Sequence, residues 1–426
     1  MNRLLFLTVA GSCLLMALAG AGCSDDGAAT GGAAGSTSDQ GESAGEAAPE
    51  ASCASDTSKA FVRPFQVDAQ DYPFMSCAFE TGHGRMHFFD EGPRDARETI
   101  LLVHGNPTWS FLYRHVAKAM IDRGHRVIAI DLLGMGMSDA PDPTRFDYRP
   151  RSQSADLEAF VVAAELQNVT LVVQDWGGPI GLGVATRRPE LFSRLLILNT
   201  WAWSIDPDDP GRDHGLLTWG TLATQLYQSD PLFGCNAMLT VTADALARTN
   251  DPDQGATYQR IRDAYLSPAM DPSTQKPLSA EDCAAMSTMA ISILGDNAYQ
   301  GEVAGGLAKL QGKPYALVSG LKDGLFGALR CDPDAASLCP DGATCECDPD
   351  YDETKNNCSA SPLGDARVCK LQGAVIEQEL DQWVERLGTG SLVARVGDPT
   401  AGHMIQEDNP NAVIAALDKL LAVPAK

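Results

Sequence analysis

Positive charge is scarce in this sequence. Its 426 residues include 32 Lys and Arg against 56 Asp and Glu, which gives a formal net charge of −24. This balance excludes nucleic acid as a partner and electrostatic attachment to an anionic membrane surface, because both require clustered basic residues. Long apolar runs are also missing beyond about residue 22, so no later segment is expected to span a bilayer.

Aromatic residues make up only 7% of the chain, and no internal repeat is visible. Hydrophobic residues nevertheless reach 44%, which is enough for a packed core and excludes wholesale disorder. The length is sufficient for one large α/β domain with an insertion.

The N-terminal segment, residues 1–22, has the composition of a signal peptide: one positive charge, a hydrophobic stretch, then small residues. Cys23 follows directly and resembles the lipidated cysteine of a bacterial lipoprotein, although Gly20 stands where that motif usually has Leu. An ordinary signal-peptidase site is the alternative. Residues 23–60 are expected to form a flexible acidic linker of Gly, Ala, Ser and Glu. The protein is therefore expected to be exported, as a periplasmic or cell-envelope lipoprotein anchored at Cys23 or as a secreted protein.

Cysteine usage agrees with export. Setting aside Cys13 and Cys23 leaves ten of the 12 cysteines, and six of these fall within residues 331–369. Such density in a segment rich in Asp, Pro and Gly predicts a disulfide-rich insertion, whose pairing the spacing does not determine. The six are Cys331, Cys339, Cys345, Cys347, Cys358 and Cys369.

Metal binding by this segment is the weaker interpretation. A zinc site would be expected to show paired Cys-x-x-Cys ligands, which are missing. The acidic residues at 348–352 suggest a calcium loop, but Glu353 stands where that loop needs Gly. No metal or cofactor is therefore expected. Two further disulfides are candidates, Cys53 with Cys77 and Cys235 with Cys283.

Short apolar runs alternate with segments of helical periodicity along much of the chain. The runs are Thr99–Val103, Arg126–Asp131, Val169–Val173, Leu195–Asn199, Pro314–Ser319 and Leu392–Val396. The alternation predicts an α/β fold, a mostly parallel sheet flanked by helices, formed by residues 61–200 and 307–426. Residues 201–306 are helix-like throughout and predict a helical cap inserted between two strands of that sheet.

Three ionisable residues follow the ends of predicted strands. Asp175 lies in the stretch Gln174-Asp175-Trp176-Gly177-Gly178, where a buried strand meets a Gly-lined turn and a helix, as in a nucleophile elbow. The alternative is an Asp that caps the helix. Asp323 and His403 follow later strands, so the chain order is nucleophile, acid, base, which is that of an α/β-hydrolase triad. A carboxylate nucleophile forms an ester with an alkyl carbon, so substrates with a leaving group on sp³ carbon are indicated.

Four segments taken together resemble a haloalkane dehalogenase. They are His104-Gly105-Asn106-Pro107-Thr108-Trp109-Ser110, Gln174 to Gly178, Gly320-Leu321-Lys322-Asp323, and Gly402-His403-Met404-Ile405-Gln406-Glu407-Asp408. The resemblance covers roughly residues 62–421 apart from the cysteine-rich insertion, and it is weakest in the cap.

The resemblance implies roles for five residues. Asp175 would displace halide from a haloalkane and carry the alkyl ester, and His403 would activate the water that hydrolyses it. Asp323 would orient His403, whose pKa is expected near or below the working pH. The side chains of Asn106 and Trp176 would bind the halide, and their backbone N–H groups would stabilise the oxyanion. The substrates would be a small haloalkane and water, and the protein is expected to be a monomer.

Two assignments have competitors. Some related dehalogenases carry the acid at the strand end after the nucleophile helix, but Asn199-Thr200-Trp201 has no carboxylate there, which leaves Asp323. Some relatives bind halide with a cap tryptophan in place of the asparagine, and Trp219 is a candidate for that part.

Other functions share parts of this residue pattern. An epoxide hydrolase shares the Asp nucleophile and uses cap tyrosines, for which Tyr227, Tyr258, Tyr265 and Tyr299 are candidates; Asn106, however, stands where an aromatic is usual. A haloacetate dehalogenase would be expected to have Arg at the position of Trp176. A non-catalytic, surface-tethered binding module is suggested by the insertion beside Asp323. A cofactor-independent oxygenase similar to the sea-pansy luciferase would have the same triad.

Overall fold

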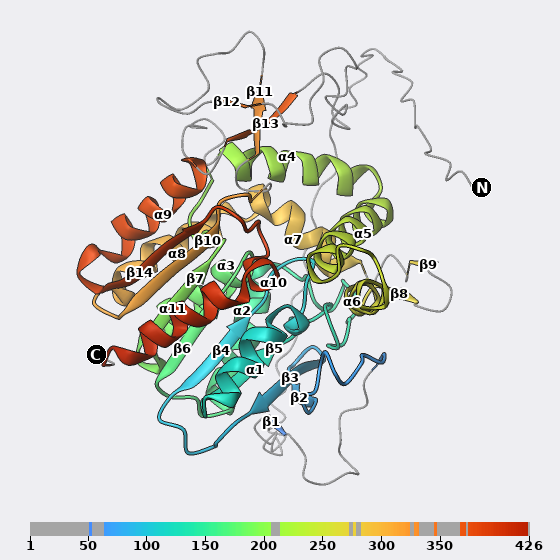
Figure 1. Ribbon diagram of the computed structural model, residues 1–426. Coiled ribbons are helices and arrows are strands. Elements are labelled where there is room, and N and C mark those ends of the chain that lie inside the picture. Colours follow the sequence, from blue (N-terminus) through green and yellow to red (C-terminus); the bar gives the residue numbers. More distant parts are fainter. Residues whose placement is uncertain are drawn as a thin grey trace, which may run out of the picture. The chain divides into compact units, whose positions relative to one another are not determined.

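The central strands of the sheet, β4, β5, β6, β7 and β10, are buried along almost their whole length. In the computed structural model, the nine strands have the order β1-β2-β3-β5-β4-β6-β7-β10-β14 (Figure 1). The strands are β1 (Ala51–Ser52), β2 (Cys77–Glu80), β3 (Arg85–Glu91), β4 (Thr99–Val103), β5 (Arg126–Ile130), β6 (Val169–Val173), β7 (Phe192–Leu198), β10 (Tyr315–Gly320) and β14 (Leu392–Asp398). From β5 to β14 all neighbours are parallel, whereas β1, β2 and β3 pair antiparallel. The predicted α/β-hydrolase fold is confirmed.

The structure describes residues 51–52, 64–205, 214–271, 276–277, 283–323, 328–331, 345–346, 367–371 and 374–424. The described residues fall within one unit of the chain, residues 48–426. The predicted signal peptide, Cys23, nearly all of the predicted linker and most of the cysteine-rich insertion lie outside the described residues. Among the helices described, none is both long and apolar enough to cross a membrane.

Helices cover both faces of the sheet, which explains why the strands are continuous apolar runs. On one face α1 (Arg114–Asp122) packs against α11 (Pro410–Ala422). On the other, α2 (Pro150–Ala163), α3 (Gly177–Arg187), α8 (Asn297–Gly306) and α9 (Ala374–Leu387) follow one another (Figure 1). All five residues of β4 and of β6 are buried between these layers.

The register brings the ends of the parallel strands to one edge of the sheet. Val103 at the end of β4 pairs with Val173 at the end of β6, and Gly320 at the end of β10 pairs with Asp398 of β14. The segments that follow these strands therefore leave the sheet side by side. This is the edge at which open parallel sheets place their sites.

Four helices between β7 and α8 form the cap over this edge. They are α4 (His214–Ser229), α5 (Pro231–Asn250), α6 (Ala256–Leu266) and α7 (Ala284–Gly295), with a short hairpin, β8 (Met270–Asp271) and β9 (Lys276–Pro277), between α6 and α7. Helix α8, which lies inside the range predicted as cap, packs against α3 of the core: the Tyr299 hydroxyl donates to the Pro179 carbonyl at 2.9 Å.

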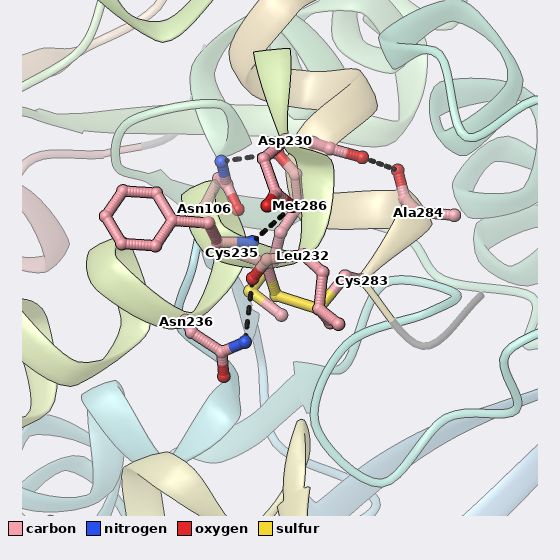
Figure 2. The surroundings of a disulfide bond; sticks show 10 residues. Asn106, Asp230, Leu232, Cys235, Asn236, Cys283, Ala284 and Met286 are labelled. Atoms are coloured by element: carbon pink, nitrogen blue, oxygen red, sulfur yellow. Dashed lines mark hydrogen bonds between the residues drawn. A yellow bond between two sulfur atoms is a disulfide. The ribbon is translucent and has the colours of Figure 1, made fainter. Parts of the chain in front are cut away.

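One predicted disulfide is present in full. Cys235 of α5 and Cys283, which precedes α7, are joined and tie two cap helices together (Figure 2). Cys77 is also disulfide-bonded, but Cys53 lies outside the described residues, so that pairing stays a prediction. Within the cysteine-rich segment a small antiparallel sheet has the order β11-β13-β12, formed by Ala328–Cys331, Arg367–Leu371 and Cys345–Glu346.

Candidate active site

The turn after β6 presents a single carboxylate at the carboxyl edge of the sheet. Asp175 has a φ of 49°, in the left-handed region, and it links β6 to α3. A Cβ on Gly177 would clash with the Val103 carbonyl, and one on Gly178 would clash with the Thr200 hydroxyl, so the tight turn needs both glycines. The N-cap residue of α3 is Trp176, not Asp175. The strained strand–turn–helix is the geometry of a nucleophile elbow.

The two carboxylate oxygens of Asp175 have different partners. Oδ1 accepts a hydrogen bond from the backbone N–H of Asn106 at 2.7 Å. Oδ2 lies 3.2 Å from Nε2 of His403. The backbone is held as well, because the Asp175 N–H donates to the Asn199 carbonyl at 2.9 Å. Oδ1 is thus fixed by a backbone donor, whereas Oδ2 faces the imidazole.

His403 bridges the two acidic residues predicted for the triad. Its Nδ1 lies 2.7 Å from Oδ2 of Asp323, while its Nε2 lies beside Asp175. All three side chains are at least nine-tenths buried. The structure therefore brings Asp175, His403 and Asp323 together in a nucleophile–base–acid arrangement.

Asn199, at the end of β7, anchors the acid. Its Nδ2 donates to Oδ2 of Asp323 at 2.8 Å, and its Oδ1 accepts from the Gly320 N–H at 2.8 Å. Sequence reasoning considered this position only as a place without a carboxylate. The structure shows that its amide holds the turn that carries the acid.

The two carboxylates control the protonation of His403. Burial lowers its pKa, but the charge of Asp323, the hydrogen bonds to Asp175 and Asp323, and the charge of Asp175 outweigh burial and raise the pKa to about 10. The expected value near or below the working pH is therefore not met while Asp175 is ionised. The physical reason is that buried His403 lies between two negative charges.

The predicted halide donors, Asn106 and Trp176, lie beside the nucleophile. The Asn106 side chain is held from the cap, because its Nδ2 donates to the Met286 carbonyl of α7 at 3.1 Å, close to the Cys235–Cys283 disulfide (Figure 2). No second described residue accepts a hydrogen bond from this amide nitrogen. Trp176 packs edge-on against Trp201, and no described residue accepts a hydrogen bond from its indole N–H.

A cavity of about 680 Å³ opens onto these groups. Its core side includes Asn106, Asp175, Trp176 and His403, and its cap side is formed by residues of α4 and α5. Trp219 of α4, the alternative halide donor, also lines it. The volume lies within the usual range for small-molecule sites.

A buried ion pair supports the segment that carries His403. Glu407 of α10 (Ile405–Asp408) pairs with Arg114 at the start of α1, and the second Arg114–Glu407 contact measures 3.0 Å. Two cap residues complete the group: Nδ2 of Asn250 donates to Glu407 at 3.0 Å, and the Tyr265 hydroxyl donates to it as well. The charge of Arg114 and these hydrogen bonds outweigh burial and lower the pKa of Glu407.

Gln174 is a further residue that sequence reasoning did not assign. Its side-chain nitrogen lies 3.0 Å from Nε2 of His403 and donates to the His403 carbonyl at 3.2 Å. Its position directly before the nucleophile was the only available signal. The Gln174 amide thus lies at the ring nitrogen that faces Asp175, whereas Asp323 lies at the other ring nitrogen.

The cap tyrosines considered for an epoxide hydrolase lie elsewhere. Tyr258 donates to Asp244 at 3.0 Å, Tyr265 donates to Glu407, and Tyr299 donates to the core. Neither these nor Tyr227 is among the residues that line the cavity.

Comparison with known proteins identifies the fold and several relatives. The family described as "alpha/beta hydrolase fold" matches residues 98–351. A cis-3-alkyl-4-alkyloxetan-2-one decarboxylase of Shewanella oneidensis is 41% identical over 139 residues, 32% of this chain and 42% of that protein. A haloalkane dehalogenase of Mycobacterium tuberculosis, "Haloalkane dehalogenase 2", is 42% identical over 142 residues, 33% of this chain and 48% of that protein.

The matched segments thus span less than half the length of these two curated relatives. Among solved structures, a tetrameric haloalkane dehalogenase from Paraglaciecola agarilytica superposes with a TM-score of 0.54 and 18% identity, covering 85% of this chain and 99% of its own. At that identity the likeness shows the fold alone. The Mycobacterium tuberculosis relative confirms the resemblance to haloalkane dehalogenases noted in the sequence.

Proposed function

Because the chain belongs to the α/β-hydrolase family, we propose that it is a hydrolase that cleaves carbon–halogen bonds of haloalkanes to an alcohol and halide. One observation carries this proposal. The Asp175 carboxylate is held between the Asn106 N–H and His403 at a cavity that the Asn106 and Trp176 side chains also line. A fixed carboxylate beside N–H donors suits displacement of an anion from sp³ carbon.

The first step is an in-line displacement. Oδ2 of Asp175 attacks the carbon that bears the halogen, the new C–O bond forms as the carbon–halogen bond breaks, and the halide leaves with the electron pair. The indole N–H of Trp176 and the free amide hydrogen of Asn106 receive the halide. Both are donors without a negative charge of their own, and an anion in a site of low polarity gains most from such groups.

The second step hydrolyses the ester. His403 takes a proton from water, the oxygen attacks the ester carbon of Asp175, and the negative charge that develops on Oδ1 is stabilised by the Asn106 N–H. Collapse breaks the bond between the Asp175 carboxyl carbon and the alkyl oxygen, and the leaving alkoxide takes the proton back from His403 to become the alcohol. The second proton of the water stays on the new Asp175 carboxyl group and passes to solvent, which restores the carboxylate. Esterification removes the charge of Asp175, one of the causes that raise the His403 pKa, so the imidazole becomes a base after the first step.

The test is halide release from 1-bromobutane and 1,2-dibromoethane by the oxidised protein that begins at Ser24. Asp175→Ala should release none, and His403→Gln should accumulate an alkyl ester visible as an added mass on the peptide that contains Asp175. Halide release that survives in Asp175→Ala would overturn the proposal.

A second candidate follows from the Shewanella relative, which is named an oxetan-2-one decarboxylase. An oxetan-2-one also offers an sp³ carbon with an oxygen leaving group. Asp175 would attack that carbon and free the ring carboxylate; loss of CO₂ would then form the alkene and expel Asp175. Alkene formation from a cis-3,4-dialkyloxetan-2-one, measured by gas chromatography, separates this activity from halide release.

An epoxide hydrolase is disfavoured by the cap tyrosines, since a ring-opening acid must reach the substrate. None of the four candidates lines the cavity among the described residues. Diol formation from styrene oxide would restore this alternative.

We also propose that the protein is exported, held in the cell envelope by a lipid on Cys23, and monomeric. The apolar segment before Cys23 supports export. Mass spectrometry of the membrane fraction should find an acylated N-terminal Cys23, and secretion into the medium would contradict the tether. A single species of monomer mass in light scattering would support the monomer.

A further inference from the structure

One face of α5 consists of short side chains spaced by one helical turn. Ala237, Val241, Ala245 and Thr249 recur at intervals of four residues, and all four line the cavity. Residues at this spacing lie above one another on the same side of a helix. From the first to the last they extend about 18 Å, since a helix rises about 1.5 Å per residue.

The cavity is therefore an elongated groove. Trp219 and Leu226 of α4 also line it, as does Asp175. Val241 lines the groove and is nevertheless 68% exposed, so the groove is open to solvent along α5. An open wall admits a substrate longer than a closed pocket would.

Beyond the proposed halide donors, the described lining of the groove has no cationic side chain for an anionic group of a substrate. Among the described residues, no Lys or Arg lines it, and besides Asp175 the one further carboxylate in that lining belongs to Asp408. That carboxylate accepts hydrogen bonds from the Gly402 N–H at 2.7 Å and from the Thr249 hydroxyl at 3.0 Å. The remaining walls are mainly Ala, Leu, Val and Met, which favour an uncharged hydrocarbon.

The volume of the cavity also favours a long substrate. If each non-hydrogen atom takes about the space of one water, ~30 Å³, the cavity of about 680 Å³ holds on the order of 20 such atoms. A bromobutane has far fewer, and it would leave most of the groove wet and its apolar walls unpaired.

We propose that this groove binds the alkyl chain of a long, uncharged electrophile whose reacting carbon lies at Asp175. The natural substrate then carries a chain well beyond butyl. This inference rests on the proposed function for the identity of the nucleophile, whereas the groove and its occupant can be tested without turnover.

The first experiment compares kcat/KM for 1-bromobutane, 1-bromohexane, 1-bromooctane and 1-bromodecane. Each added methylene should raise kcat/KM about two- to fourfold, the gain from burying one CH₂ group. Ala237→Trp and Ala245→Trp each fill part of the groove. At least one should flatten this rise, so that the ratio of kcat/KM for 1-bromodecane to that for 1-bromobutane falls. Arg248→Trp, on the same helix but outside the cavity, is the matched control and should keep the rise.

The second experiment measures binding alone, on Asp175→Asn. Bromoalkanes quench tryptophan fluorescence, and Trp176 and Trp219 line the groove. Affinity should increase along the same series in Asp175→Asn and lose that increase when Ala245→Trp or Ala237→Trp is added. If affinity and kcat/KM were independent of chain length, the proposal that the groove binds the alkyl chain would be wrong, whereas the proposed dehalogenation would stand. Chain-length-dependent binding with no halide release from any substrate would overturn dehalogenation and keep the groove.

Discussion

The hydroxyl of Tyr265, on cap helix α6, donates a hydrogen bond to Glu407, four residues beyond His403. Glu407 is fully buried against Arg114 and is also bonded to Asn250 of α5. A second hydrogen bond joins the cap to the same segment, because the Thr249 hydroxyl of α5 donates to Asp408. The cap is therefore bonded directly to the segment that holds His403, the proposed base.

Removing one partner of the buried pair should be costly. Glu407→Ala leaves the Arg114 charge buried without its carboxylate, and we expect the free energy of unfolding to fall by about 3–5 kcal/mol. Tyr265→Phe keeps the ion pair and should cost only about 1–2 kcal/mol. Urea denaturation of both variants measures the difference. Equal losses in the two would show that the pair does not dominate this cluster.

The Tyr265→Phe variant also tests whether the cap positions His403. Hydrolysis of the ester depends on His403, whereas the displacement step depends on Asp175. We therefore expect single-turnover hydrolysis to slow several-fold while the initial release of halide is little changed. If Tyr265 had a purely structural role, Tyr265→Phe would change neither rate in the folded protein, or it would slow displacement and ester hydrolysis by the same factor.

Stability should fall as the pH rises above neutrality. The pKa of His403 is raised to about 10 in the folded protein, above the usual value of about 6.5 for the unfolded chain. Its contribution to stability is therefore complete below about pH 6.5 and is lost as the pH rises through about 10. The urea midpoint of the wild type should decrease over this range, and that of His403→Gln should decrease less. Parallel curves for the two proteins would contradict the raised pKa.

The pH dependence of ester hydrolysis should give an apparent pKa for His403 that is lower than its pKa in the free enzyme. Once Asp175 is esterified, its charge no longer favours protonated His403, so the neutral imidazole is available at lower pH. The single-turnover hydrolysis rate should rise with pH and reach a plateau well below pH 10. A rise that continues to about pH 10 would indicate that Asp323 alone sets the pKa.

Asn199→Ala should weaken catalysis through the acid. The substitution removes a donor to buried Asp323 and the acceptor for the Gly320 N–H. We expect kcat to fall about tenfold with KM nearly unchanged, because neither atom lines the cavity. In the Asp323→Asn background the same change should have little further effect on kcat. If the two substitutions lowered kcat by independent factors, Asn199 would not act through Asp323.

The Cys235–Cys283 disulfide should support halide binding. Cys283 directly precedes α7, whose Met286 carbonyl fixes the Asn106 amide. In the double variant Cys235→Ala, Cys283→Ala, the free energy of unfolding should be lower by about 2–5 kcal/mol. The KM for haloalkanes should be higher. In the Asn106→Ala background its effect on KM should vanish. A KM effect that persists there would place the influence of the disulfide outside Asn106.

Much of the fold and the triad could be predicted because the signals are local. The strands Thr99–Val103 and Val169–Val173 are fully buried, so their apolar runs end where the polar site residues begin. Asp175, Asp323 and His403 each follow a strand end, and parallel strands carry such residues to one edge. These assignments needed no knowledge of side-chain contacts.

The rest depends on contacts that sequence patterns do not encode. Strand β3 was not predicted, because it buries polar His87 and Asp90 among its apolar residues. Arg114 and Glu407 pair across 293 residues, and nothing near either one indicates the other. The protonation of His403 follows from distances to two carboxylates, which only the folded arrangement determines.

The turn that carries Asp323 is tied to the sheet before the chain goes on into the cysteine-rich segment. The N–H groups of Leu321 and Lys322 donate to the Asp398 and Ala401 carbonyls at 2.8 and 2.9 Å, and Gly320 packs too closely on Gly402 to admit a side chain. These backbone bonds hold the turn to β14 and to the loop that follows it. Foreign sequence of varied length, such as an affinity tag or a reporter domain, should be graftable at this point with the triad left in register.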